Sequence, residues 1–385
     1  MSTPSTVAAD AQRQAAALAT LLDAVRRRRA EFDARQAISD DVIELMKAAG
    51  VYRALVARRF GGEERAPSDF LRLIERISIA DGSAGWVASF GFAAVYLSAL
   101  PVATLEQIYA RTPDVVFAGG IFPPQPAPAV AGGVRVSGRW AWGSGATGAD
   151  LIGVGIKTDD GTEGGLPRIA VMPRERVRIS ENWEVNGLKG TGSHDIVVED
   201  VVVPLEWTFV RGGASTLETP LFRYPSMALA AQVLAVVGLG VARAALDEIR
   251  SIAGERTSIT GAPALGERAY VQTEIAKSEA ALRSARAFFY EATDEAFSRL
   301  EAGDALDRNG VNLLRLASSH AARTGAEVAR SVYTISGTTG IFTEHPIARF
   351  MQDAIVVPQH AFLSEGTWQN AGRVFLGLGT PPGFP

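Results

Sequence analysis

The sequence of 385 residues contains no cysteine. This absence excludes disulfide bonds, thiolate nucleophiles, iron–sulfur clusters and cysteine-ligated zinc. Histidine is scarce as well, because the chain has four and they lie far apart: His194, His320, His345 and His360. A histidine-rich metal site is therefore not expected, and we predict chemistry that uses a bound organic cofactor or ordinary acid–base groups.

An excess of positive charge is also missing, since 38 lysines and arginines stand against 42 aspartates and glutamates, for a net charge of −4. A nucleic-acid-binding protein would carry a basic surface, so we expect no nucleic-acid partner. The longest apolar run, Ala228–Val241, is interrupted by Gln232 and is too short to span a bilayer. The first residues show no basic segment followed by an apolar run, so no signal peptide is predicted. These features predict a cytoplasmic protein with no membrane segment.

What the sequence does contain is the composition of a packed globular protein, with 47% hydrophobic and 21% charged residues. Its length corresponds to two or three domains of about 150 residues each. Residues 1–112 have a helical pattern, residues 113–212 carry valine and glycine in short alternating runs typical of strands, and residues 213–385 are again helical in pattern. We therefore predict an α+β fold with an N-terminal helical domain, a small antiparallel β-barrel or sandwich, and a C-terminal four-helix bundle.

Local signals predict several element boundaries. Ser39 with Asp40 marks the start of a helix and Gly50 its end, a second helix follows the triplet Pro67–Asp69, and a third spans about 84–100. The last block predicts long helices over about 265–301, 307–336 and 347–378. In the middle block, residues of one parity would share one face of a strand: Val134, Val136, Trp140, Trp142 and Ser144. Further strands are predicted at 151–156, 168–172 and 195–203.

The segment ADGSAGWVASFGF is the first motif with a possible function. Asp81 and Ser83 can cap a helix, and Gly82 and Gly85 allow its first turn to pack closely. The simplest interpretation is a capped helix with a buried Trp86.

A second motif is GRWAWGSGATGADL. Trp140 and Trp142 on one strand face, followed by Ser144 between glycines, would form a flat apolar surface with one hydroxyl at its edge. Such a surface suits a planar ring system that also needs a hydrogen bond. The alternative is that both tryptophans belong to the core between domains.

The third motif, NGLKGTGSHD, predicts a tight loop before a strand. Its glycines let the backbone approach a ligand, and Thr191 and Ser193 supply hydroxyl groups. The loop does not match GxxxxGK[ST], and no GxGxxG turn opens a helix, so nicotinamide binding by a Rossmann fold is not predicted. The alternative is an ordinary hairpin turn.

The C-terminal segment carries the remaining candidates, His360 and Glu365. Five positions apart, they would lie about 140° apart on a regular helix. They can border one cavity if the helix bends at Pro358. His360 is the better proton donor or acceptor near neutral pH. The alternative is a structural histidine, which is how we interpret His320.

The order of these motifs is more specific than any one of them. The DGSAGW segment, the WxWxSG strand, the GLKGTGS loop and the C-terminal PxxRFxxD…H…G…LG pattern together resemble the acyl-CoA dehydrogenase superfamily. More closely, they are similar to its branch of two-component flavin-dependent monooxygenases, whose oxygenase components act on p-hydroxyphenylacetate, dibenzothiophene or indole-3-acetate. The resemblance covers about residues 10–378. Its helix–strand–helix order agrees with the fold predicted above.

The resemblance implies that reduced flavin, FMN or alternatively FAD, binds between the β domain and the C-terminal bundle. Trp142 and Ser144 match the family's flavin-contacting strand, with Ser144 near the reactive edge of the ring as a catalytic residue. Thr191 and Ser193 match the loop beside the flavin ring or its ribityl chain. Arg256 falls where the family often places an arginine on the flavin phosphate.

His360 matches the histidine that the monooxygenases place beside the C4a-hydroperoxide of the flavin. A hydrogen bond from the imidazole would prevent premature loss of hydrogen peroxide. The implied enzyme receives reduced flavin from a separate NAD(P)H:flavin reductase and uses O2 to hydroxylate a small aromatic or heteroaromatic substrate, such as a phenol or an indole. The family also implies a homotetramer formed through the C-terminal bundle.

The sequence departs from the family's pattern in two places. Where related monooxygenases carry a substrate-binding histidine, this chain has Phe90, Phe92 and Tyr96, so we expect substrate binding by aromatic packing, with Trp368 as a further contact. In SEGTWQ, Glu365 borders the expected substrate pocket and stands where true acyl-CoA dehydrogenases place their catalytic base. An FAD-dependent acyl-CoA dehydrogenase with Glu365 as base is therefore an alternative, and a non-catalytic flavin-fold binding subunit is another.

Overall fold

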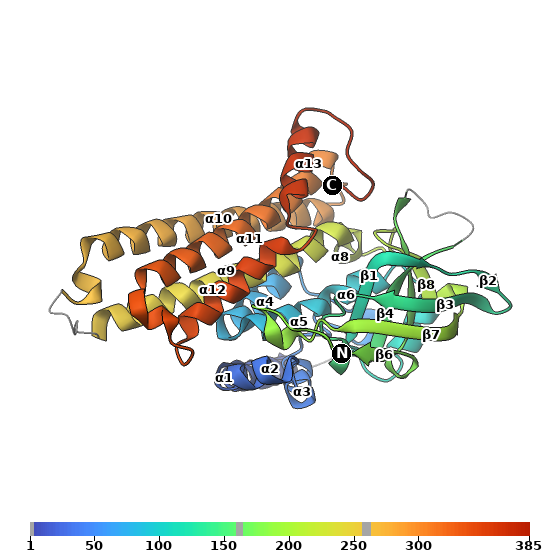
Figure 1. Ribbon diagram of the computed structural model, residues 1–385. Helices are drawn as coiled ribbons and strands as arrows, with labels where there is room; N and C mark the ends of the chain where they lie inside the picture. The colour runs from blue at the N-terminus through green and yellow to red at the C-terminus, as the bar shows by residue number, and fades with distance from the viewer. Residues whose placement is uncertain (1–3, 159–164, 256–262) are drawn as a thin grey trace.

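The structure is a computed structural model that describes residues 4–158, 165–255 and 263–385. Figure 1 shows a long helical bundle on one side, a β region on the other, and the first three helices of the chain beneath the bundle and its junction with the β region. Along the chain, helices are followed by strands and then by helices again. The predicted α+β fold class is confirmed.

The N-terminal helices are α1 (Pro4–Arg27), α2 (Arg29–Arg35), α3 (Asp40–Ala48), α4 (Pro67–Ala80), α5 (Gly82–Ser89), α6 (Ala93–Leu97) and α7 (Val102–Ile108). The start predicted at Ser39 and Asp40 is confirmed, whereas the second helix begins at Pro67, at the first residue of the Pro67–Asp69 triplet rather than after it. The third predicted helix is wrong as a continuous element, because a 3-10 turn at Phe90–Phe92 interrupts it. The hydroxyl of Ser89 donates to the carbonyl oxygen of Trp86 (2.7 Å), and such a bond competes with continuation of the helix.

The β region contains two four-stranded sheets, in the strand orders β1-β4-β5-β8 and β2-β3-β7-β6. The strands are β1 (Phe117–Pro126), β2 (Ala129–Val130), β3 (Gly133–Trp140), β4 (Leu151–Lys157), β5 (Arg168–Pro173), β6 (Arg178–Ser180), β7 (Asp195–Val203) and β8 (Thr208–Val210). The predicted antiparallel arrangement needs one correction, since β1 pairs with β4 in parallel. Sequence reasoning missed β1 because it is rich in glycine and proline. Gly119 is required there, since a Cβ would lie 2.4 Å from the carbonyl oxygen of Gly153 on β4.

The predicted strand face from Val134 to Ser144 holds only in part. Val134, Val136 and Trp140 are buried on one face of β3. The strand ends at Trp140, and Trp142 has a positive φ of 64° and a 66% exposed side chain. The expectation that both tryptophans share one face is therefore wrong, because the turn after β3 reverses the direction of Trp142.

The C-terminal helices are α8 (Pro220–Arg223), α9 (Ser226–Glu255), α10 (Ala269–Glu301), α11 (Arg308–Ile335), α12 (Pro346–Val356) and α13 (Glu365–Phe375). Helices α9 to α12 pack together, and α13 projects from the bundle (Figure 1). The predicted helix over 347–378 is wrong as a single element, because it is divided between α12 and α13. A 3-10 turn at Val357–Gln359 separates them, and Pro358 within that turn removes a backbone donor that a continuous helix needs.

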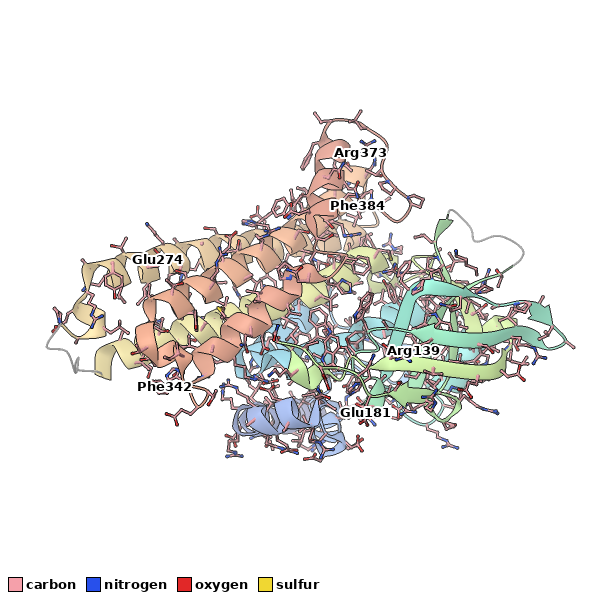
Figure 2. The ribbon with its side chains drawn as sticks, viewed as in Figure 1. Arg139, Glu181, Glu274, Phe342, Arg373 and Phe384 are labelled. Carbon is pink, nitrogen blue, oxygen red and sulfur yellow. The ribbon has the colours of Figure 1, made fainter. Side chains whose placement is uncertain are left out.

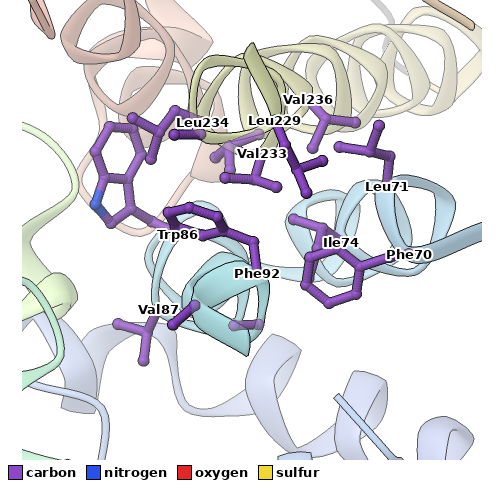
Figure 3. Close-up of a cluster of buried hydrophobic side chains, with 14 of the residues drawn as sticks. Phe70, Leu71, Ile74, Trp86, Val87, Phe92, Leu229, Val233, Leu234 and Val236 are labelled. Carbon is purple, nitrogen blue, oxygen red and sulfur yellow. The ribbon is translucent and has the colours of Figure 1, made fainter. Parts of the chain in front are cut away.

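Helix α9 lies at the centre of the core. By length and composition it could cross a membrane, but 94% of its apolar window is buried inside the protein, so it is a core helix. Figure 3 shows apolar side chains of α4, α5 and α9 meeting in one cluster. Trp86 of α5 lies at the edge of this cluster, with its indole nitrogen directed away from it. The packing of α5 on α9 thus positions an N–H donor at the rim of the core.

Candidate active site

A buried charge cluster joins the first and the last motif. Nη1 of Arg349 on α12 lies 2.6 Å from Oδ2 of Asp81, and its Nε and Nη2 lie 3.0 and 2.9 Å from the carboxylate of Asp33. Oδ1 of Asp81 accepts a hydrogen bond from the backbone N–H of Ala84 (2.7 Å), so Asp81 caps α5 as predicted. The arginine of the C-terminal motif therefore fixes the helix that carries Trp86.

Asp353, one turn after Arg349, connects this cluster to the glycine-rich loop. Its Oδ1 accepts a hydrogen bond from the backbone N–H of Leu188 at 2.6 Å. Burial raises the pKa of Asp353 to about 6, against the opposing effect of Arg349. The N–H of Gly190 donates to the hydroxyl of Ser83 (3.1 Å). The loop connects the antiparallel pair β6 and β7, as the hairpin alternative held, and it is also held in place by α5 and α12.

Three hydroxyl groups form a buried chain beside this loop. Oγ of Ser144 lies 2.6 Å from Oγ of Ser193, which lies 2.7 Å from Oγ1 of Thr191. The indole N–H of Trp86 donates to Oγ of Ser144 at 3.2 Å. The hydroxyl of Thr191 donates to the carbonyl oxygen of Leu188 at 2.9 Å. The structure thus brings together three hydroxyl residues that were predicted from two separate motifs.

The contacts at the two ends of the hydroxyl chain determine which hydroxyl group donates each hydrogen bond within it. The single hydroxyl proton of Thr191 is used on the carbonyl of Leu188, so Ser193 must donate to Thr191. By the same reasoning, Ser144 must donate to Ser193. Trp86 occupies one lone pair of Ser144. Ser144 therefore keeps one free lone pair and no free proton, so it offers an acceptor to a neighbouring ligand.

Trp142 lies two residues before Ser144 and presents a large exposed ring. Its backbone is in a left-handed region that residues other than glycine rarely adopt, which marks a position held by its surroundings. Trp140 is different, because it is fully buried and its indole N–H donates to the carbonyl oxygen of Gly155 at 2.8 Å. The alternative that both tryptophans belong to the core is therefore right for Trp140 and wrong for Trp142, whose exposed ring precedes Ser144 by two residues.

His360 contacts the same indole that contacts Ser144. The ring centroids of His360 and Trp86 are 6.1 Å apart. Burial, and then the positive charges of Arg211 and Arg315, lower the pKa of His360 to about 4, so its imidazole is neutral near pH 7. Its Nδ1 accepts a hydrogen bond from the backbone N–H of Phe362 (3.2 Å), which places the proton of the neutral ring on Nε2. His360 is therefore a neutral N–H donor.

The predicted aromatic residues form a continuous wall. The ring centroid of Phe92 lies 4.9 Å from that of Tyr96 and 6.3 Å from that of Phe90. The hydroxyl of Tyr96 contacts Sδ of Met227 at 3.4 Å. Met227 in turn lines a cavity of about 370 Å³. This volume lies within the range of small-molecule sites, about 300–1,000 Å³.

Comparisons with known proteins show which family the chain belongs to. A family model described as "Acyl-CoA dehydrogenase, C-terminal domain" matches residues 232–365. The chain is 29% identical to the flavin-dependent monooxygenase oxygenase subunit HsaA of Rhodococcus jostii, covering 89% of this chain and 93% of that protein. It is 58% identical to indole-3-acetate monooxygenase of Pseudomonas putida, covering 96% of this chain and 95% of that protein, and 49% identical to that of Acinetobacter baumannii, covering 97% of each. The chain belongs to the flavin-dependent monooxygenases with the acyl-CoA dehydrogenase fold.

Solved structures have the same fold as this monooxygenase. The 3-HSA hydroxylase from Rhodococcus sp. RHA1 superposes with a TM-score of 0.89 at 25% identity, covering 96% of this chain and 98% of that chain. TdsC from Paenibacillus sp. A11-2, in its complex with FMN and indole, superposes with a TM-score of 0.82 at 18% identity, covering 97% and 100%. The predicted fold and family are confirmed.

Three other predicted residues of the monooxygenase lie away from this cluster or cannot be placed. Glu365 begins α13, where its side chain is 78% exposed and ion-paired with Arg323. Trp368 packs against the half-buried His320, with ring centroids 6.4 Å apart. Neither Glu365 nor Trp368 is among the residues that line the cavity. Arg256 lies outside the described residues. Their roles in binding stay predictions.

Sequence reasoning missed the hydrogen bond of Trp86 and two buried arginines. Trp86 is 7% exposed, as the capped-helix interpretation expected, but its partner Ser144 is 58 residues away. Arg315 had a signal, because the small residues Ser318 and Ser319 follow it at helical spacing on a closely packed face of α11. Arg211 follows β8 in a glycine-containing turn, where no local pattern predicts burial.

Proposed function

We propose that this flavin-dependent monooxygenase binds reduced FMN, with FAD as the second candidate, and uses O2 to hydroxylate an aromatic substrate of the indole-3-acetate type. The observation that carries the proposal is the position of Trp86, which contacts both Ser144 of the hydroxyl chain and His360. The substrate class is supported by the two relatives of that name, which match over nearly their whole length.

The residues of the hydroxyl chain fit a flavin in its reduced form. The flavin ring is planar, and Trp142 offers an exposed aromatic face near Ser144. Reduced flavin carries an N–H at N5 that oxidised flavin lacks, and Ser144 presents an acceptor without a free proton. Thr191 and Ser193 keep Ser144 in that state, and Arg256 is our candidate for the flavin phosphate. When bound, reduced flavin supplies the two electrons that reduce one atom of O2 to water while the other enters the substrate.

The role of His360 follows from its charge and tautomer. A neutral imidazole with its proton on Nε2 donates a hydrogen bond to an oxygen atom in the site without transferring that proton. A protonated imidazole would be an acid strong enough to release hydrogen peroxide. The wall of Phe90, Phe92 and Tyr96 excludes water from the same region and suits a planar substrate.

The assembly we propose is a cytoplasmic homotetramer that receives its flavin from a separate NAD(P)H:flavin reductase. The absence of a nicotinamide motif from the sequence supports a separate reductase. The projecting α13 and the residues after it expose Phe375, Leu376 and Leu378, and apolar side chains grouped this way are typical of an interface between copies. Figure 2 shows this projection, with Arg373 labelled on it. Light scattering that gives the mass of a monomer would contradict the tetramer.

The two alternatives are less well supported. A dehydrogenase base must lie in a dry site beside the substrate, whereas the side chain of Glu365 is 78% exposed and paired with Arg323. A dehydrogenase would also be purified with bound FAD, and an acyl-CoA would reduce that FAD without any reductase. A non-catalytic subunit would bind neither redox form of a flavin, which a flavin titration measures.

The experiment that tests the proposed function supplies the purified protein with chemically reduced FMN and indole-3-acetate, and then with ¹⁸O2. We expect one ¹⁸O atom per molecule of product by mass spectrometry. The His360→Ala variant should release more hydrogen peroxide and form less product, while the control His345→Ala, which removes a histidine from the start of α12, should behave as the wild type. Flavin binding without any ¹⁸O in the indole product would overturn this substrate assignment.

A further inference from the structure

Two buried arginines lie beside the proposed substrate region, and no carboxylate of the described residues pairs with either of them. Arg211, after β8, is 8% exposed, and Arg315, on α11, is 3% exposed. Among the described residues, neither side chain pairs with a carboxylate, and the Nε–H of each has no hydrogen-bond partner. Arg315 has one long contact, from Nη1 to the carbonyl oxygen of Gly383 at 3.5 Å. Buried arginines are normally paired, so this pair needs a different explanation.

Aromatic rings hold the two guanidinium groups in place. The Cζ atoms of Arg211 and Arg315 lie 4.7 and 5.0 Å from the ring centroid of Phe362. Phe122 and Phe384 complete the stack at 5.2 and 4.9 Å, and Phe384 lies beside α13 (Figure 2). Contacts with ring faces stabilise the charge, but they leave the N–H donors in the guanidinium plane without acceptors.

The two positive charges also oppose each other. Burial, and then the charge of Arg211, lower the pKa of Arg315 to about 10. Tyr96 of the aromatic wall acts on this pKa in the other direction. A fold that buries two like charges in this way is stabilised when an anion binds between them.

The cavity of about 370 Å³ gives such an anion access to both arginines, since each lines it. Most other lining residues are apolar or small, among them Phe122, Met227 and Phe362. Met227 contacts Tyr96 of the aromatic wall, and the ring of Phe362 lies 5.3 Å from that of His360. The ring of Phe362 therefore lies between an anion held here and His360.

We propose that Arg211 and Arg315 together bind the carboxylate of the aromatic substrate, and that this contact selects aromatic acids over neutral rings of the same shape. The inference rests on the proposed function, because it places the substrate beside His360. A ligand with a planar ring and one carboxylate matches an apolar cavity with two guanidinium groups. The two guanidinium groups present planar pairs of N–H donors, which suit the two oxygen atoms of a carboxylate.

The test compares two probes that differ in the carboxylate: indole-3-acetate and 3-methylindole. Binding to the protein loaded with reduced FMN is measured without oxygen. In the wild type we expect indole-3-acetate to bind at least about thirtyfold more tightly, the effect of losing one desolvated charge pair. Arg315→Met and Arg211→Met should each remove most of this preference by weakening indole-3-acetate alone, and Arg315→Lys should restore part of it. The matched control is Arg330→Met, an exposed arginine on the same helix.

The outcomes separate the inference from the proposed function. If the wild type binds both probes equally, the carboxylate site is wrong, although hydroxylation of either ring would leave the monooxygenase assignment intact. If Arg315→Met weakens reduced FMN but not reduced riboflavin, the arginines hold the flavin phosphate and the inference is overturned. The wild-type comparison needs no variant, so equal binding of the two probes overturns the inference even if the methionine variants fail to fold, and Arg315→Lys then tests the assignment to the arginines.

Discussion

The loss of one cation, Arg349, should destabilise the protein strongly. In the Arg349→Met variant, the carboxylates of Asp81 and Asp353 lose their counter-charge while they are 0% and 2% exposed, whereas Asp33 is 28% exposed. Removing one partner of a buried ion pair costs about 3–5 kcal/mol, because the remaining charge stays in a poorly solvated place. We expect a loss of that size in the free energy of unfolding.

A matched control is Arg28→Met in the N-terminal helices. Arg28 also pairs with two carboxylates, but those of Glu31 and Asp41 are 39% and 64% exposed, so water replaces the lost contact. Exposed pairs are worth about 0–1 kcal/mol. The difference between the two variants therefore measures burial rather than the number of ion pairs.

Thermal denaturation followed by circular dichroism measures both variants under one condition. Arg349→Met should unfold at a clearly lower temperature than Arg28→Met, and the amide of Leu188, which donates to Asp353, should exchange its hydrogen faster. The double variant Arg349→Met/Asp353→Asn should recover part of the loss, since it removes one of the two buried charges. Equal unfolding temperatures for Arg349→Met and Arg28→Met would refute the reasoning.

Three further predictions follow from the site and its packing. Ser193→Ala frees the hydroxyl proton of Ser144, so oxidised flavin should gain affinity relative to reduced flavin by about 1–2 kcal/mol, whereas Ser144→Ala should weaken the binding of reduced flavin. Titrations in which Ser193→Ala leaves the ratio of the two affinities unchanged would contradict the proposed direction of the hydrogen bonds. Because the folded-state pKa of His360 is lowered to about 4, the unfolded chain binds more protons between about pH 4 and 6.5, so this group should lower stability as pH falls through that window. A ring titration by NMR with a midpoint above about pH 6 would disprove this. Gly85→Ala should destabilise by about 1–3 kcal/mol in thermal denaturation, because its Cβ would lie 2.8 Å from Cβ and 2.9 Å from Cα of Ser78. An unchanged unfolding temperature would contradict this close packing.

The sequence predicted elements whose limits are set by neighbours in the chain. The start of α3 beside Ser39 was correct, and α4 begins at Pro67, within one turn of its predicted start after Asp69. The predicted direction of the Trp142 side chain was wrong because it depends on where β3 ends. Pairing with β7 decides where β3 ends, and the alternation of residues along the sequence does not show it.

The candidate site was predictable only as separate motifs. Ser144, Ser193 and His360 were identified from their motifs, but the contact of Trp86 with both Ser144 and His360 depends on how three regions of the chain pack. Asp81 and Arg349 stood in recognised motifs, yet their pairing spans 268 residues and has no local signature. The contact of the two buried arginines with one phenylalanine ring was not predictable for the same reason, because it depends on how distant regions of the chain pack.

The position of Glu75 on α4 has a consequence for how the protein is made. This carboxylate is 6% exposed and receives hydrogen bonds from Arg286 and from the hydroxyl of Tyr290 on α10, and Arg286 follows Glu75 by 211 positions in the sequence. At about 5–20 residues per second, a ribosome needs roughly 10–40 seconds to synthesise that stretch. Until then α4 exposes an apolar side and an unpaired acid. Fragments that end before α9 should therefore aggregate, and full-length chains should need protection by chaperones during synthesis.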